Sequence, residues 1–215
     1  MGSVIELLGV PGVGKSTIGK LAVVNTDYQF IDSADIILAE ARKLGLSLTS
    51  HDEIPLIPEK NLIDILHLTR KRIEEISSNN KLLLDGYLNI RIGRLGYWLL
   101  TPDVLRSRKT IGIIIVIASP SQIIKWRKKN ANSRKRSIRP FFEISIEQSL
   151  IIDIAVRVSM DLGIPLKVVY NREGALDKAV KEVKEFIIGI EELYSQFKLL
   201  SHVHQRPLFN FKSKS

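Results

Sequence analysis

The chain contains no cysteine among its 215 residues. This absence excludes a disulfide scaffold and any metal site built from thiolates. A sequence without cysteine also suits the reducing interior of a cell, where disulfides are rare. We therefore expect a cytoplasmic protein whose fold is held together by a hydrophobic core.

Long hydrophobic runs are missing as well. The longest one, IGIIIVIA at 111–118, is far shorter than the roughly 20 residues that a membrane-spanning helix needs. The first residues, MGSVIELLG, have neither a basic segment nor a small-residue cleavage site, so we expect no signal peptide. These features predict a protein without a membrane partner.

Acidic residues are fewer than basic ones, with 23 Asp and Glu against 32 Lys and Arg and a formal net charge of +9. The basic residues cluster at 70–72, at 106–109 and at 127–139. A basic surface attracts polyphosphates and nucleic acid equally well. Charge alone therefore leaves both classes of partner open.

Short apolar segments alternate with helical patterns along the chain. The segments that we expect to form strands are 4–8, 28–32, 81–85, 111–118 and 166–170. Such alternation predicts an α/β fold, with a parallel five-stranded sheet and helices on both of its faces. We expect a single domain over residues 1–200, followed by a basic tail at 201–215.

Two local features of this pattern lead to more detailed expectations. Residues 86–101 are rich in glycine and aromatic side chains, and they predict an irregular loop. Ser33 precedes a helical pattern that ends at Gly45, so we expect Ser33 to be the N-cap of that helix.

The segment GVPGVGKST at 9–17 fits the phosphate-loop pattern G-x-x-x-x-G-K-[ST]. Its glycines allow backbone N–H groups to turn toward a phosphate, and the following helix adds positive potential. A chance glycine turn is the alternative, but the segment directly follows a strand pattern and precedes a helix. The residues expected to bind the cofactor ATP are Gly9, Gly12, Val13, Gly14, Lys15, Ser16 and Thr17.

Magnesium is the metal that this chemistry requires. The hydroxyl of Ser16 is expected to bind Mg²⁺. Asp85 ends the apolar strand pattern KLLLD, and an acid at that place in P-loop proteins holds Mg²⁺ directly or through water. The alternative is that Asp85 only caps a turn with Gly86.

A basic segment at about 128–143 lies between two predicted helices. Phosphoryl transfer needs cations that neutralise the transferring group and exclude water. Arg127, Arg134, Arg136 and Arg139 supply such charges, so we predict a small lid. The alternative is a solvated connection, which is the usual interpretation of a run of charge.

Taken together, these segments resemble the archaeal-type adenylate kinases over about residues 4–188. The phosphate loop is shared by many families, whereas LKVVYNREGALDKAV at 166–180 is more specific. Gly96-Tyr97 with Pro102 and the segment LLLDGY at 82–87 also resemble patterns of adenylate kinases.

The resemblance implies a P-loop NTPase core and the reaction MgATP + AMP ⇌ 2 ADP. It implies an AMP-binding region between the second strand and the loop after Asp85, and a homotrimer. By motif match, Lys15 keeps its phosphate-loop role, and Arg134 and Arg136 occupy the lid pair. Arg127 takes the place of a basic residue before the lid, so all four are catalytic candidates.

The chain also departs from the family pattern. Ser137 stands where the family lid has Asp, and Ile152 stands where an Arg usually follows the lid. Losing one cationic group can slow a phosphoryl transfer by roughly 10³-fold or more. Either another arginine, such as Arg139 or Arg157, supplies the missing charge, or the activity or acceptor has changed.

Two classes of function therefore fit the sequence. The first is a nucleoside monophosphate kinase, with AMP as the leading acceptor and another nucleoside monophosphate as the second choice. The alternative is an RNA- or ribosome-associated P-loop ATPase on the same scaffold, which the charge of +9 favours. Arginines near 70–72 and 91–94 that converge on one pocket would indicate a kinase, whereas an exposed basic stripe would indicate RNA binding.

Replacement of Lys15 tests the phosphate-loop interpretation. We expect Lys15→Met to abolish phosphoryl transfer while the fold survives, because the lysine contacts the phosphates rather than the core. Turnover and the circular-dichroism melting curve are measured on the same preparation. Full activity in the folded variant would contradict the assignment.

Overall fold

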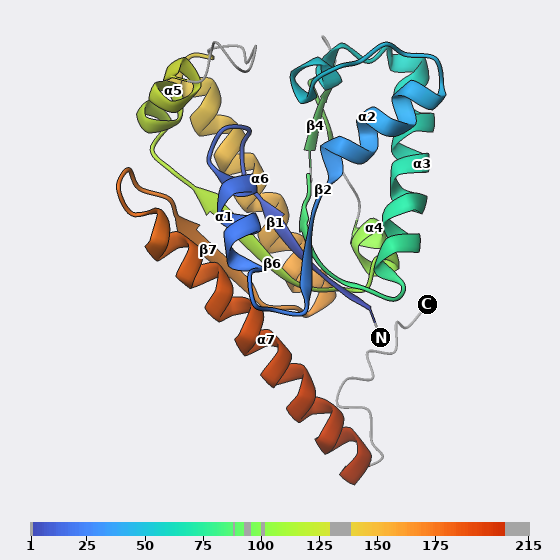
Figure 1. The fold of residues 1–215 in the computed structure, drawn as a ribbon, viewed down its shortest axis with the longest axis vertical. Helices are drawn as coiled ribbons and strands as arrows, with labels where there is room; N and C mark the ends of the chain where they lie inside the picture. The colour runs from blue at the N-terminus through green and yellow to red at the C-terminus, as the bar shows by residue number, and fades with distance from the viewer. Residues whose placement is uncertain (1, 88, 93–95, 100–101, 130–138, 205–215) are drawn as a thin grey trace.

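A computed structural model of the chain describes residues 2–87, 89–92, 96–99, 102–129 and 139–204 (Figure 1). Its centre is a five-stranded sheet in the order β2-β3-β1-β6-β7, with every neighbouring pair parallel. The strands are β1 Ser3–Leu8, β2 Tyr28–Asp32, β3 Lys81–Asp85, β6 Thr110–Ile117 and β7 Leu166–Tyr170. The predicted α/β fold with a parallel five-stranded sheet is confirmed.

Helices connect the strands and cover the sheet. They are α1 Lys15–Ala22, α2 Ser33–Lys43, α3 Glu59–Ser77, α4 Pro102–Ser107, α5 Pro120–Lys129, α6 Phe141–Leu162 and α7 Leu176–His204, with a 3₁₀ helix η1 at His51–Leu56. Figure 1 shows the last turns of α7 projecting beyond the sheet. No helix in the described part of the chain is both long and apolar enough to cross a membrane.

The strands are apolar because both faces of the sheet are covered. On one face α1 and α7 pack against each other, and Gly19 of α1 lets that helix approach Leu7 of β1 closely. On the other face, Ile73 of α3 packs with Val4 of β1 and with β3. Alternate residues of the central strand therefore enter different cores, as expected for a buried parallel strand.

The register of the sheet fixes where a site can form. Asp85 at the end of β3 pairs with Leu7 of β1 on one side and with Asp32 of β2 on the other. The carboxyl ends of these three strands therefore meet at one edge. Ligands of open α/β sheets bind at this edge.

One predicted segment is wrong. Within residues 86–101, β4 Asn89–Ile92 and β5 Gly96–Leu99 pair as an antiparallel hairpin, where we expected an irregular loop. Glycines in this segment indicate a loop, but the Ile residues of β4 and the Tyr and Trp of β5 favour strands.

Other expected boundaries need correction. Asp32, and not Ser33, is the N-cap of α2, because its side chain accepts a hydrogen bond from the Ala34 N–H at 3.0 Å. Helix α6 begins at Phe141, directly after Pro140, so the last residues of the segment 128–143 that we expected to connect two helices are helical. Residues 201–204 belong to α7, so only 205–215 of the predicted tail lie outside the described residues.

Close packing between β6 and α7 generates a stability prediction. A Cβ at Gly112 would press on the side chains of Ile190 and Phe186, whereas a Cβ at Gly189 would meet nothing within 4 Å. We expect Gly112→Ala to lower the free energy of unfolding by about 1–3 kcal/mol through overpacking. Gly189→Ala should raise it by about 0.5–1 kcal/mol, because Gly is a poor residue inside a helix.

Urea denaturation of both variants checks this prediction. Both substitutions add one methyl group, at a crowded position of a strand in Gly112→Ala and at an open position of a helix in Gly189→Ala. Equal free energies of unfolding for the two variants would contradict the packing of α7 on β6.

Candidate active site

The phosphate loop joins the end of β1 to the start of α1. Its three glycines have positive φ angles, with Gly9 at 146°, Gly12 at 89° and Gly14 at 101°. Side chains other than glycine rarely adopt such angles. Gly14 is the N-cap of α1, so the first N–H groups of that helix open toward the loop without helical partners. The loop has the conformation that its sequence predicts.

Two distant segments hold the loop by its carbonyl groups. Arg127 of α5 donates to the Pro11 carbonyl oxygen from Nε at 3.1 Å and from Nη2 at 2.5 Å. Asn171, just after β7, donates from Nδ2 to the Val13 carbonyl oxygen at 2.8 Å. Both side chains are buried, with 4% and 6% of their surface exposed. With these carbonyl groups occupied on the protein side, the loop is fixed before any ligand arrives.

Lys15, Ser16 and Asp85 meet at the mouth of the loop. The Lys15 ammonium donates to the Gly9 carbonyl oxygen at 2.8 Å and lies 3.5 Å from Oδ1 of Asp85. The Ser16 hydroxyl donates to Oδ2 of the same carboxylate at 3.0 Å. Asp85 therefore faces the phosphate loop rather than only capping a turn.

This group of oxygens fits Mg²⁺. The ion prefers hard oxygen ligands, and it is often bound by one or two protein side chains with water and phosphate oxygens filling the other positions. The hydroxyl of Ser16 and the carboxylate of Asp85 already lie within hydrogen-bonding distance of each other. Ser16 and Asp85 would hold the ion through their oxygen atoms in place of this hydrogen bond, and the serine hydroxyl would keep its proton.

Residues at the end of the neighbouring strand β2 hold the backbone of Asp85. Ser33 donates from its hydroxyl to the Asp85 carbonyl oxygen at 2.6 Å. Burial and the charge of Asp85 raise the pKa of Asp32, whose carboxylate caps α2. Carboxylates of β2 and β3 thus lie at the same edge of the sheet, near the loop.

His51 is a residue that sequence reasoning did not connect with any site. Its Nε2 lies 2.7 Å from Oδ1 of Asp35, and its Nδ1 lies 3.9 Å from Oδ2 of Asp32. The three side chains offer ligand atoms within 4.8 Å of one another. Asp35 belongs to α2 and His51 to η1, so the spacing of these residues in the sequence does not predict the cluster.

The structure separates the predicted cationic residues. Arg127 is a buried support of the loop, as described above. Arg134 and Arg136, and most of the predicted lid at 128–143, lie outside the described residues. The role of the lid therefore stays a prediction.

The structure also describes Ile152, which stands where the family pattern has an arginine after the lid. Ile152 is half-buried and packs against the main core. An apolar contact thus stands where the family usually has a charged side chain. Arg157 is exposed on α6, whereas Arg139 is largely buried and forms an ion pair with Glu147 at 2.8 Å. Of the two arginines considered as replacements, only Arg139 is held in place by a buried partner.

The basic patch at 70–72 does not form a cationic pocket. Arg70 pairs with Glu74 at 2.8 Å and Arg72 pairs with Glu75 at 3.1 Å, both within α3. The side chains at 91–94 lie outside what the structure describes. Arg70 and Arg72 therefore form neither the cationic pocket expected of a kinase nor an unpaired basic stripe expected of an RNA-binding protein.

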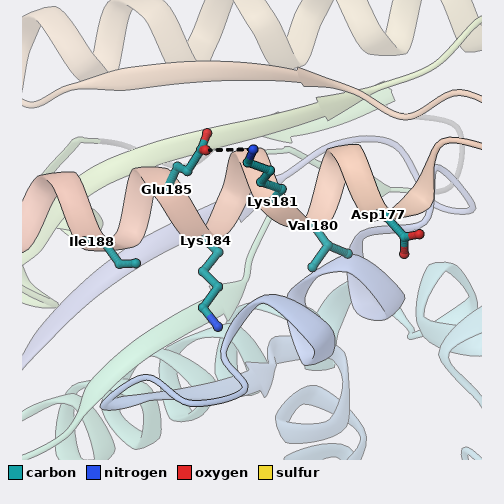
Figure 2. Close-up of a pocket in the computed structure, with 6 residues that line it drawn as sticks. All are labelled: Asp177, Val180, Lys181, Lys184, Glu185 and Ile188. Atoms are coloured by element: carbon teal, nitrogen blue, oxygen red, sulfur yellow. Dashed lines mark ion pairs between the residues drawn. The ribbon is translucent and has the colours of Figure 1, made fainter.

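A shallow groove lies on α7, away from these residues (Figure 2). It is lined by Asp177, Val180, Lys181, Lys184, Glu185 and Ile188. Lys184 donates to the Val24 carbonyl oxygen at 2.8 Å, and Lys181 pairs with Glu185 at 3.8 Å. Its polar groups serve the packing of α7 against α1, and we assign the groove no ligand.

Comparison with known proteins agrees with this geometry. Residues 8–144 match the family model described as an AAA domain. The adenylate kinase of Pyrococcus abyssi is 31% identical over 191 residues, covering 87% of this chain and 96% of that protein. The adenylate kinase of Pyrococcus furiosus is 30% identical over 193 residues, covering 88% and 95%.

Solved structures agree at the level of the fold. A gluconokinase from Sinorhizobium meliloti superposes with a TM-score of 0.52 at 18% sequence identity, covering 94% of this chain and 98% of that one. The adenylate kinase relatives, rather than this likeness of fold, place the chain in the class of the small P-loop kinases. Within it, the chain belongs to the archaeal-type adenylate kinase family.

Proposed function

We propose that this protein is an adenylate kinase, which transfers the γ-phosphoryl group of MgATP to AMP. The convergence of Lys15, Ser16 and Asp85 on a pre-formed phosphate loop carries the proposal. The likeness to adenylate kinases along nearly their whole length supports the choice of AMP.

The residues divide the work of the reaction. The loop N–H groups and Lys15 would bind the β- and γ-phosphates, and Lys15 would leave Asp85 to do so. Ser16 and Asp85 would hold Mg²⁺, which neutralises charge on the phosphates when bound. Direct transfer needs little covalent chemistry from the protein, so positioning and charge account for most of the rate.

The acceptor half of the proposed site lies after the end of β3. Tyr87 follows Asp85 by two residues and packs against the apolar cluster formed by α2, α3 and η1. We propose that this cluster gives an acceptor base an apolar wall. Arg134 and Arg136 are proposed to supply charge from the lid at 128–143. The homotrimer and the cytoplasmic location stay predictions from the sequence.

A phosphoryl-transfer assay distinguishes the candidate functions. Purified protein is given MgATP with AMP, CMP, UMP, GMP or a deoxy form, and ADP formation is followed. We expect rapid ADP formation with AMP and much slower reaction with the other acceptors. Selective transfer to another nucleoside monophosphate would keep the kinase class and change the substrate.

ATP hydrolysis with and without RNA is measured in parallel. No transfer to any monophosphate, together with hydrolysis that rises on addition of RNA, would contradict the proposal. That result would instead favour the RNA-associated ATPase on the same scaffold.

A further inference from the structure

An acidic residue occupies the middle of the central strand. Glu6 of β1 is 1% exposed, and it pairs in the sheet with Leu84 of β3 and Ile113 of β6. Its immediate neighbours along β1, Ile5 and Leu7, are apolar and fully buried, and the strand is covered on both faces. An ionised side chain at such a place is costly unless a partner compensates for it.

Arg108 is that partner. Its side chain reaches Glu6 from the turn between α4 and β6, with Nη1 lying 3.4 Å from Oε1, and it is 2% exposed. Burial raises the pKa of Glu6, and the guanidinium opposes that effect. A buried ion pair is often no more stabilising than apolar side chains of the same size. Stability alone therefore does not account for the pair.

The carboxylate of Glu6 lies between Arg108 and the turn that follows Asp85. Oε1 of Glu6 meets Arg108, while Oε2 touches the Cα region of Gly86, where an added Cβ would collide with it. Gly86 directly follows Asp85, which faces the phosphate loop on the other side of the sheet. The negative end of the pair thus lies against the turn that carries the metal-binding carboxylate.

We propose that the Glu6–Arg108 pair strengthens Mg²⁺ binding at Asp85 by holding a negative charge behind the Asp85–Gly86 turn. Glu6 is a positioning residue in this account, since it touches neither nucleotide nor metal. Arg108 anchors the carboxylate in its buried place. The inference rests on the proposed nucleotide site and identifies a residue outside the phosphate loop that tunes it.

The test measures binding of the non-hydrolysable ATP analogue AMP-PNP by calorimetry, with and without Mg²⁺, at fixed ionic strength. The ratio of the two affinities is the Mg²⁺-dependent gain. Glu6→Gln keeps the size of the side chain and an oxygen for Arg108, but it removes the charge. We expect this variant to lose about fivefold or more of the gain, because charges act over several ångströms inside a protein. Binding without Mg²⁺ should not weaken.

Glu191→Gln is the matched control. Glu191 pairs with Lys81 at 2.6 Å, at the opposite end of β3 from Asp85. This substitution removes the same charge from α7, beside the end of β3 that is opposite to Asp85. We expect its Mg²⁺-dependent gain to stay within about twofold of the wild type.

A double variant covers the case in which Glu6→Gln does not fold. Glu6→Leu with Arg108→Leu replaces the pair by apolar side chains, which buried ion pairs commonly tolerate. It should still lose about threefold or more of the gain, because the nearer, negative end of the pair is gone.

The outcomes separate this inference from the proposed function. Binding by the wild type with an unchanged gain in folded Glu6→Gln, or in the double variant, would overturn the inference alone. Equal losses in Glu6→Gln and Glu191→Gln would also overturn it, since the effect would then be one of net charge. No AMP-PNP binding by the wild type would overturn the proposed function and the inference with it.

Discussion

The phosphate loop depends on being held by its carbonyl groups. A loop that turns its N–H groups toward an anion must turn carbonyl groups the other way, and buried carbonyl groups need donors. Arg127 and Asn171 are those donors, and they come from segments more than a hundred residues away in the chain. The parallel sheet brings the ends of β6 and β7 beside the end of β1, so the loop is formed by the fold as a whole.

The same logic extends to Asp85 at the end of β3. Ser33 holds the backbone of Asp85, and Lys15 and Ser16 hold its side chain. Ser33 follows β2, whereas Lys15 and Ser16 both follow β1, so the carboxylate is fixed by the two neighbouring strands rather than by its own loop. Glu6 adds a buried charge on the opposite face. This edge of the sheet is thus built from residues that neighbour each other only in the folded chain.

Sequence reasoning succeeded where local pattern decides the structure. The spacing of Gly9, Gly14 and Lys15 predicts the loop, and the apolar runs predict the sheet. It failed where the decision is tertiary, as in the β4–β5 hairpin and the cap of α2 at Asp32. The Glu in the strand segment VIELL was an available signal, because a charge inside a buried strand needs a partner. Arg108 could not be identified as that partner without the fold.

Membership of the archaeal-type adenylate kinase family and the departures from its pattern are compatible in this structure. Ile152, in place of the family arginine, packs against the main core, so this departure leaves the packing of α6 intact. Arg139 is held by Glu147 at the start of that helix, while Arg70 and Arg72 are committed to acids of α3. Lys15, Ser16 and Asp85 therefore lie together as the family pattern predicts, and the departures at Ser137 and Ile152 lie elsewhere in the chain.

The most direct test of this account is the affinity of Asn171→Ala for ATP, measured by calorimetry against Arg172→Ala. Asn171 is buried and holds Val13, whereas its neighbour Arg172 is exposed and stacks on Tyr170. A buried carbonyl without its donor costs about 1–3 kcal/mol, so we predict at least about a fivefold loss of affinity in the first variant only. Wild-type affinity in folded Asn171→Ala would contradict the claim that the loop is fixed by its carbonyl groups.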